Sequence, residues 1–198
     1  MHARNILLAC IAAVIIGIAS FYVARRFLES REARQQALLR CMAVSTISAF
    51  NDSGVQYWLD FGTLLGVIRE GDIILGDNDV DICIRDDDDT RARMEGPVRT
   101  RLQAQGYELK RLTWSAYRVR AHGLFVDVYI TKTSGDTIIG ATGPNSNVAS
   151  ALVGTPKWVQ WPRCAIRVLV PEHVHDVLVW RYGEDYMTPK RNFKGRDA

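Results

Sequence analysis

The sequence predicts an α/β (α+β) domain behind an N-terminal transmembrane helix, and three observations support this prediction. Residues 5–24 carry no charged side chain and are mostly aliphatic. Apolar side chains recur between residues 29 and 50 at the spacing of one helix face. Residues 77–82 alternate acidic with apolar side chains, which is the period of a β-strand, and further strand-like runs lie between residues 107 and 130.

Length and composition limit the classes of protein to consider. The 198 residues give room for one domain of ordinary size, without a low-complexity tract or an evident repeat. The net charge of +3 gives no argument for nucleic acid as a partner. The four cysteines form no cluster typical of a zinc site, and both a Cys41–Cys164 disulfide and free thiols stay open.

The uncharged run predicts a membrane anchor over residues 1–27. As a helix, residues 5–24 would span about 30 Å, which is the thickness of a bilayer core. A cleaved signal peptide, with Gly17 and Ala19 at its cleavage site, is the alternative. The length of the run, and the lack of a polar region before that site, favour a retained anchor.

Two local signals disagree about the side of the membrane on which the body lies. The apolar run is preceded by Arg4 and followed by Arg25, Arg26, Arg31 and Arg34. The positive-inside rule therefore favours a cytosolic body. The sequon Asn51-Asp52-Ser53 instead favours a luminal body.

The first part of the body is predicted to alternate helices with strands. A helix over residues 29–50 is ended by the polar residues 51–54. The elements expected next are a strand around Tyr57–Leu59, a small-residue turn at Gly62-Thr63, a short helix through Arg69, and an acidic strand as far as Ile84.

The acidic run Asp86 to Asp89 is interpreted as the start of a helix and not as a metal site. Carboxylates in a first helical turn interact favourably with the free amides and the macrodipole. The helix is expected to continue towards Gln105, with a break or kink at Gly96-Pro97, and to end at Gly106.

Three runs after this helix predict strands, over residues 107–113, 116–121 and 124–130. The last run is apolar on both faces except for Asp127. An unpaired buried carboxylate is costly, so Asp127 needs a partner, which is ordinarily an arginine or a lysine. His122, between the last two runs, is expected to be a turn residue.

The C-terminal part is predicted to open with a long loop over residues 132–157, around the apolar pair Ile138-Ile139. Trp158, Trp161 and residues 166–170 suggest a further strand. Pro171 is expected to open a helix that Gly183 ends. Residues 190–198 are expected to be a disordered tail.

The acidic strand supplies the candidate metal ligands. Asp77, Asp79 and Asp81 are two residues apart, so a strand places them on one face, where neighbouring carboxylates repel. A bound cation relieves this repulsion, and carboxylate oxygens are hard ligands that suit Mg²⁺ or Mn²⁺.

Three other interpretations compete for the same aspartates. An EF-hand loop is rejected because it needs a glycine where this chain has Ile82. A haloacid-dehalogenase-type phosphatase would make Asp77 a nucleophile after an apolar strand at residues 73–76. The third alternative is a solvated acidic loop without a ligand.

The stretch from Phe61 to Ile82 resembles the LicD/fukutin family. That family shows a GTLLG turn, here residues 62–66, then an arginine, here Arg69, and an acidic cluster that alternates with Ile or Val. A second segment, residues 182–189, is similar to the closing YG-D-YM-x-P segment of the family. The sequence departs from the family at Glu70, where His is common, and at Gly76, where Trp is common.

The resemblance implies a nucleotidyltransferase-like mixed sheet flanked by helices in residues 28–189. It also implies a metal-dependent phosphotransferase, which moves a phosphorylated group of the phosphocholine or ribitol-phosphate type from a CDP-linked donor to a glycan or glycoprotein acceptor. Family members in eukaryotes usually face the Golgi lumen, so the resemblance favours a luminal body over the cytosolic one. A catalytically degenerate, membrane-anchored adaptor is the alternative that is not an enzyme.

Residue roles follow from the resemblance. Asp79 and Asp81 would hold Mg²⁺ or Mn²⁺, and Asp127, as the third carboxylate from a neighbouring strand, would complete the site and accept the proton of the attacking hydroxyl. The substrate-binding positions would be Gly62 and Thr63, which face the phosphates, with Asp77 next to the metal, and Arg69, which would clamp a phosphate or form a structural salt bridge.

Overall fold

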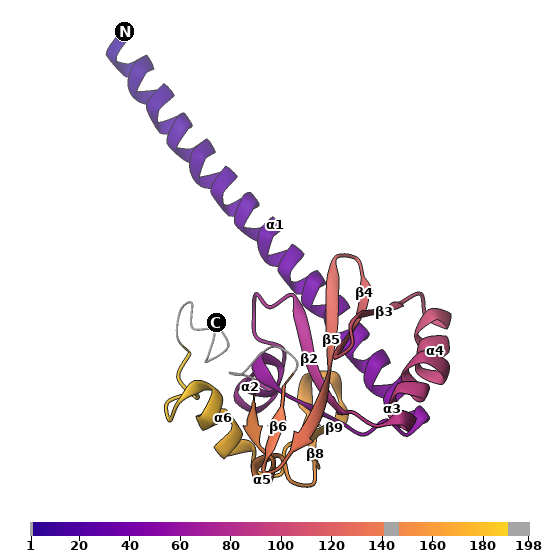
Figure 1. Cartoon of the computed structure of the whole chain (residues 1–198). Coiled ribbons are helices and arrows are strands. Elements are labelled where there is room, and N and C mark those ends of the chain that lie inside the picture. Colours follow the sequence, from indigo (N-terminus) through magenta and orange to yellow (C-terminus); the bar gives the residue numbers. More distant parts are fainter. Residues whose placement is uncertain (1, 141–146, 190–198) are drawn as a thin grey trace.

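The computed structural model describes residues 2–140 and 147–189, and it gives no side-chain description for residues 2–15 and 88. One long helix, α1 (His2–Ser53), projects from a body in which a sheet carries helices on both of its sides (Figure 1). The predicted tail at residues 190–198 lies outside the described residues.

Only the C-terminal part of α1 packs against the body. Side chains from residue 16 to residue 34 are exposed, whereas Leu39, Met42, Ala43, Ile47 and Phe50 are buried. These residues recur at the spacing of one helix face, so the predicted helix over residues 29–50 is confirmed, as the end of a longer helix.

The structure gives no support to the predicted transmembrane anchor. Among the residues whose side chains are described, no helix is long and apolar enough to cross a membrane. The anchor was predicted for residues 1–27, and residues 1–15 of that range lie outside the described side chains.

The main sheet is mixed, as predicted. Its path runs β1-β2-β5-β4-β3, with β6 paired to β5 and β7 paired to β6. Strands β2 and β5 are parallel, and the other described pairs of this sheet are antiparallel. The strands are β1 (Tyr57–Leu59), β2 (Asp79–Arg85), β3 (Glu108–Thr113), β4 (Ala116–Ala121), β5 (Leu124–Ser134), β6 (Thr137–Ile139) and β7 (Val148–Ala149).

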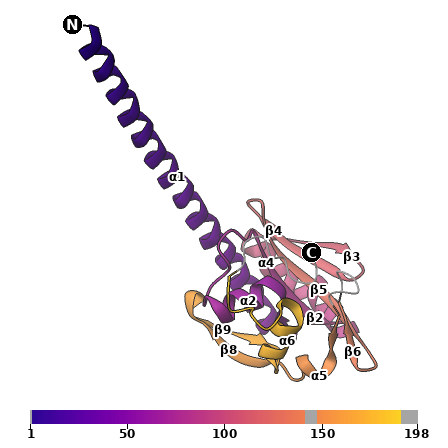
Figure 2. The same cartoon turned by 90° about the vertical axis from the view of Figure 1, so that its left-hand side faces the viewer.

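Helices cover the sheet from both sides. In Figure 1, α2 and α6 lie on one side of β2 and β5, and α3 and α4 lie on the other. A separate antiparallel pair, β8 (Lys157–Trp161) and β9 (Ile166–Val170), lies beneath α2 in the turned view of Figure 2. The helical elements after α1 are α2 (Phe61–Arg69), α3 (Asp88–Arg93), η1 (Met94–Val98), α4 (Arg99–Ala104), α5 (Ser150–Val153), η3 (Pro162–Cys164) and α6 (Val174–Tyr182).

Several local predictions are confirmed. Asp87 caps α3 by accepting a hydrogen bond from the Thr90 amide, so the acidic run does start a helix. The π-helical turn η1 contains Gly96-Pro97, where a break was expected. Gly106 and His122 have positive φ angles and end α4 and β4 respectively.

Four predictions about elements were wrong. Gly62 and Thr63 form no separate turn, because Asp60 caps α2 and starts the helix at Phe61. The segment over residues 132–157 is no loop, because β5 continues to Ser134 and β6, β7 and α5 follow, although residues 141–146 are not described. Pro171 does not open α6, since the amides of Glu172 and His173 donate to carbonyl oxygens of α5.

The fourth correction concerns Asp77. Strand β2 starts at Asp79, so Asp77 precedes the strand, and it is not among the carboxylates that lie together. The sequence also left open whether Cys41 and Cys164 form a disulfide or stay free thiols. Cys41 is exposed and free, and Cys164 is also free, so the two form no disulfide in this structure.

Candidate metal centre

The parallel pairing of β2 and β5 brings three carboxylates together. Asp81 lies opposite Asp127 in the register, and Asp79 lies opposite Phe125. Because side chains two residues apart share a face of the sheet, Asp79, Asp81 and Asp127 all point to the same side. One oxygen of each carboxylate lies within 4.8 Å of the others. We call these three residues the aspartate trio.

The trio is shielded from water to different degrees. Asp127 is 6% exposed, and Asp79 and Asp81 are half-buried. Burial, and next the neighbouring carboxylates, raise the pKa of Asp79 above its ordinary value and the pKa of Asp81 well above it. The protein therefore holds negative charges where they are costly, and a cation bound between them would lower that cost.

Helix α2 fixes the position of Asp81. The Thr63 hydroxyl, at the start of the helix, accepts a hydrogen bond of 2.8 Å from the Asp81 amide. The Tyr129 hydroxyl donates to Oδ1 of Asp81 over 3.3 Å. The buried Thr63 side chain therefore joins α2 to β2, and in this structure its hydroxyl is not on an open surface.

The two glycines of the GTLLG segment allow close approaches. A Cβ atom on Gly66 would lie 2.6 Å from the carbonyl oxygen of Asp72 and 3.0 Å from the amide of Ile74. A Cβ atom on Gly62 would lie 3.4 Å from a carboxylate oxygen of Asp77. Gly66 therefore lets the segment after α2 fold back against the helix, and Gly62 lies beside Asp77.

Asp77 lies outside the aspartate trio. It is half-buried, and burial, followed by the charges of Asp79 and Glu70, raises its pKa to about 6. The nearby charge of Arg69 acts in the opposite direction. Asp77 is thus a neighbour of the trio and adds a further negative charge beside it.

Arg69 forms a salt bridge in this structure. Its Nη2 and Nε donate to Oε1 of Glu70 over 2.6 and 3.1 Å, and its Nη1 donates to the Tyr186 carbonyl oxygen over 3.3 Å. Of the two roles that the sequence left open, the contacts favour the structural one. The same contacts join the two segments of the chain that resemble the LicD/fukutin family.

Sequence reasoning gave Asp127 an unspecified basic partner, and the structure identifies it as Arg118. The Nε and Nη2 atoms of Arg118 donate to the two carboxylate oxygens over 2.6 and 2.7 Å. The register of the β4–β5 hairpin sets this pairing, since Ala121 faces Leu124 and Arg118 therefore faces Asp127. The short turn at His122-Gly123 was the signal that could have located this partner.

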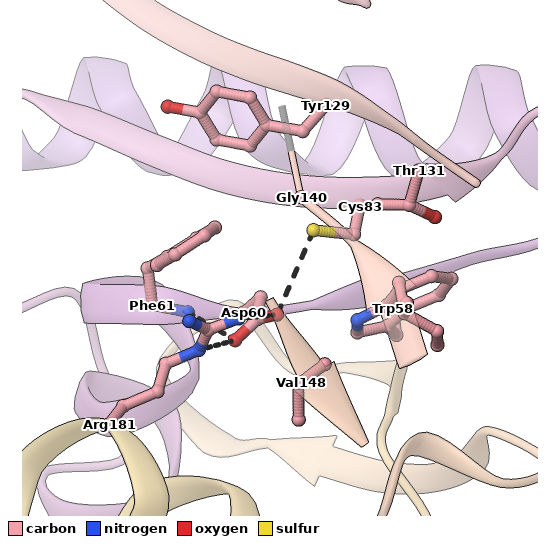
Figure 3. Close-up of a pocket in the computed structure, with 10 residues that line it drawn as sticks. Trp58, Asp60, Phe61, Cys83, Tyr129, Thr131, Gly140, Val148 and Arg181 are labelled. Atoms are coloured by element: carbon pink, nitrogen blue, oxygen red, sulfur yellow. Dashed lines mark hydrogen bonds and ion pairs between the residues drawn. The ribbon is translucent and has the colours of Figure 1, made fainter. Parts of the chain in front are cut away.

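Sequence reasoning missed the buried pair Asp60–Arg181. Arg181 of α6 donates to both carboxylate oxygens of Asp60 over 2.6 and 2.7 Å, and both side chains are 2% exposed. The Arg181 guanidinium also lies over the Phe61 ring, 4.0 Å from its centroid. Figure 3 shows this pair in a small pocket that Tyr129 also lines, with the Cys83 thiol pointing to Asp60 over 3.8 Å.

The trio has the chemistry of a site for a divalent cation. It offers carboxylate oxygens alone, which are the ligands that Mg²⁺ and Mn²⁺ prefer. The three negative charges of the trio and the positive charge of Arg118 leave two negative charges, which one divalent ion would balance. The side-chain donor set therefore fits the metal that the sequence predicts.

The comparisons with known proteins identify the family. Residues 54–180 match the family described as "LicD/FKTN/FKRP, nucleotidyltransferase domain". No curated protein shows a significant match to this sequence. Among solved structures, the chain is similar to the solution structure of the antibiotic-resistance factor ANT(2'')-Ia, at 11% identity and a TM-score of 0.41, over 55% of each chain.

A crystal structure of ANT(2")-Ia in complex with adenylyl-2"-tobramycin is similar at 11% identity and a TM-score of 0.39, over 53% of this chain and 56% of that chain. The family match covers well over half of the sequence, from Gly54, three residues before β1, to the last turn of α6, and it includes the whole aspartate trio. This chain therefore belongs to the LicD/FKTN/FKRP family of nucleotidyltransferase domains.

Proposed function

We propose that this protein is a metal-dependent transferase, which moves a phosphorylated group from a CDP-linked donor to a glycan or glycoprotein acceptor. The observation that carries the proposal is the aspartate trio, in which oxygens of Asp79, Asp81 and Asp127 lie within 4.8 Å of one another. Family membership supports a transferase, and the choice of donor and acceptor rests on the resemblance.

The trio would hold Mg²⁺ or Mn²⁺. When bound, the ion would neutralise the charge that develops on the diphosphate and on the leaving nucleotide. The protein contributes rigid positions for the ligands, because Thr63 fixes the backbone of Asp81 and Arg118 fixes the carboxylate of Asp127. Such prior ordering avoids reorganisation during the reaction.

The proton of the acceptor hydroxyl needs a base in this mechanism. The sequence suggested Asp127, but both of its oxygens already accept hydrogen bonds from Arg118. Asp79 is half-buried and has a raised pKa, so it is the better base of the two in this geometry.

The structure argues against the phosphatase alternative. That chemistry would place Asp77 at the end of a strand over residues 73–76, but residues 71–78, all of which are described, contain no strand. Asp77 is also not a member of the trio, although it is a neighbour of it. We therefore expect Asp77→Asn to lower turnover only in part, whereas a phosphatase with Asp77 as its nucleophile would lose turnover altogether.

The test is to exchange a trio member for its neutral isostere. Asp81→Asn should weaken Mn²⁺ binding, measured by calorimetry, and lower donor turnover by about 100-fold or more, because the ion would supply most of the charge stabilisation. In chelator, the same variant should unfold at the same temperature as the wild type or higher, since carboxylate repulsion is relieved. Wild-type turnover by Asp81→Asn would end the catalytic proposal.

A further inference from the structure

Arg118 lies at the edge of the aspartate trio in a fixed orientation. Its guanidinium makes two hydrogen bonds to Asp127 and lies over the ring of Phe125, 4.4 Å from the centroid. The ring and the carboxylate together restrict the plane of the guanidinium. A group held in this way loses little freedom when it binds something else.

The Asp127 pair does not exhaust the hydrogen-bonding capacity of Arg118. A guanidinium carries five N–H donors, and Asp127 accepts two of them. Among the described residues, no acceptor is hydrogen-bonded to Nη1 of Arg118. The side chain is also 33% exposed, whereas that of Asp127 is 8% exposed. The unused donors are therefore accessible at the solvent side of the trio.

A structural role alone does not account for this exposed side. A salt bridge that only neutralised Asp127 could be fully buried, as the Asp60–Arg181 pair is. Arg118 instead presents a positive charge beside three carboxylates. An anion that reaches the trio has to approach these negative charges, and a guanidinium with free donors offers it an attractive contact there.

We propose that Arg118 is a substrate-binding residue, which donates to phosphate oxygens of the nucleotide donor while it keeps its hold on Asp127. The ligand class is a nucleoside diphosphate group, whose oxygens match the fork of the guanidinium. This inference rests on the proposed function. It assigns to Arg118 the phosphate contact that the sequence suggested for Arg69, which is engaged with Glu70 and Tyr186.

The test compares Arg118→Gln and Arg118→Lys with a matched control in the full-length chain. Arg120→Gln removes an arginine from the same face of β4, two residues further on, where it pairs with Glu108 and not with the trio. Calorimetry would measure the binding of Mn²⁺ alone, and of CDP in saturating Mn²⁺. Thermal melts in chelator would show that each variant folds. If Arg118→Gln does not fold, the binding measurements on Arg118→Lys test the proposal.

The affinities for the two ligands should respond differently to these substitutions. Arg118→Gln removes a positive charge beside the trio, so Mn²⁺ alone should bind as tightly as in the wild type or more tightly. CDP should bind about 10- to 100-fold more weakly, as expected for the loss of charge-assisted hydrogen bonds. Arg118→Lys should retain Mn²⁺ affinity and lose part of the CDP affinity, and Arg120→Gln should change neither.

Two results would overturn the inference. If Arg118→Gln lost Mn²⁺ and CDP binding together, Arg118 would only position Asp127. If it bound CDP like the wild type, Arg118 would not contact the phosphates. In both cases, Mn²⁺ binding by the wild type and its loss in Asp81→Asn would leave the proposed function intact. A wild type that bound neither Mn²⁺ nor CDP would overturn both proposals.

Discussion

Replacing Asp77 by Asn should stabilise the metal-free protein at neutral pH. Burial and the charges of Asp79 and Glu70 raise the pKa of Asp77 from its ordinary value of 3.8 to about 6. A raised pKa in the folded state means that ionisation of this carboxyl opposes folding. The stability that the protonated Asp77 carboxyl contributes is complete at a pH below its pKa in the unfolded chain. This stability is lost as the pH rises through its pKa in the folded protein.

The size of the effect follows from this shift. A change of one pKa unit corresponds to about 1.4 kcal/mol, so the shift of Asp77 gives an upper value of about 3 kcal/mol. Asp77 is only half-buried, and solvent screening reduces this to about 1–2 kcal/mol. In a chain of this length, each kcal/mol changes the melting temperature by about 2–4 °C. Asp77→Asn should therefore melt several degrees higher than the wild type.

Melting curves in chelator at about pH 7.5 and about pH 4 test both the sign and the size of the change in stability that Asp77→Asn causes. The advantage of Asp77→Asn should be present at the higher pH and mostly absent at the lower one. The matched control is Asp86→Asn. Hydrogen bonds from Arg91 and next from Lys132 outweigh burial and lower the pKa of Asp86. This control should therefore be less stable than the wild type at neutral pH, and the difference should shrink in acid. A variant Asp77→Asn that melted at or below the wild-type temperature at pH 7.5 would refute the reasoning.

Three more predictions concern the rest of the chain. Arg181→Met should lower the free energy of unfolding by about 3–5 kcal/mol in denaturant titrations, because it leaves Asp60 buried and unpaired, and adding Asp60→Asn should restore part of the loss. Gly66→Ala should cost about 1–3 kcal/mol in the same assay, since its Cβ would meet backbone atoms, whereas Gly96→Ala, which has open space, should not. The sequence predicts a membrane anchor at residues 1–27 with a luminal body. The protein should therefore resist carbonate extraction and be protected from protease in sealed vesicles. Release by carbonate would refute the anchor.

Short-range patterns were sufficient to predict most elements of the body. The alternation of acidic and apolar side chains located β2, and Gly106 and Gly183 located the C-terminal ends of α4 and α6. Asp79 and Asp81 could be placed on one face because they lie two residues apart on one strand. Their distance to Asp127 depended on which strand pairs with β2, and the resemblance to a known family supplied that information, not the spacing of residues.

Long-range contacts could not be predicted in this way. Asp60 and Arg181 are 121 residues apart, and nothing in either local sequence marks the other as a partner. The segment over residues 132–157 was misread because its polar, glycine-containing composition is typical of a loop. Hydrogen bonds to the edge of β5 hold part of it in strands nevertheless.

These long-range pairs also explain why the C-terminal segment belongs to the site. Arg181 of α6 holds Asp60, and Asp60 caps α2. Within the first turn of α2, the Thr63 hydroxyl accepts a hydrogen bond from the amide of Asp81. A series of direct contacts therefore runs from the C-terminal helix to a carboxylate of the trio. Because loss of one partner from a buried ion pair is strongly destabilising, weakening the Asp60–Arg181 pair should loosen the start of α2 and with it the position of Asp81. The C-terminal helix thus contributes to the geometry of the trio without contributing a carboxylate to it.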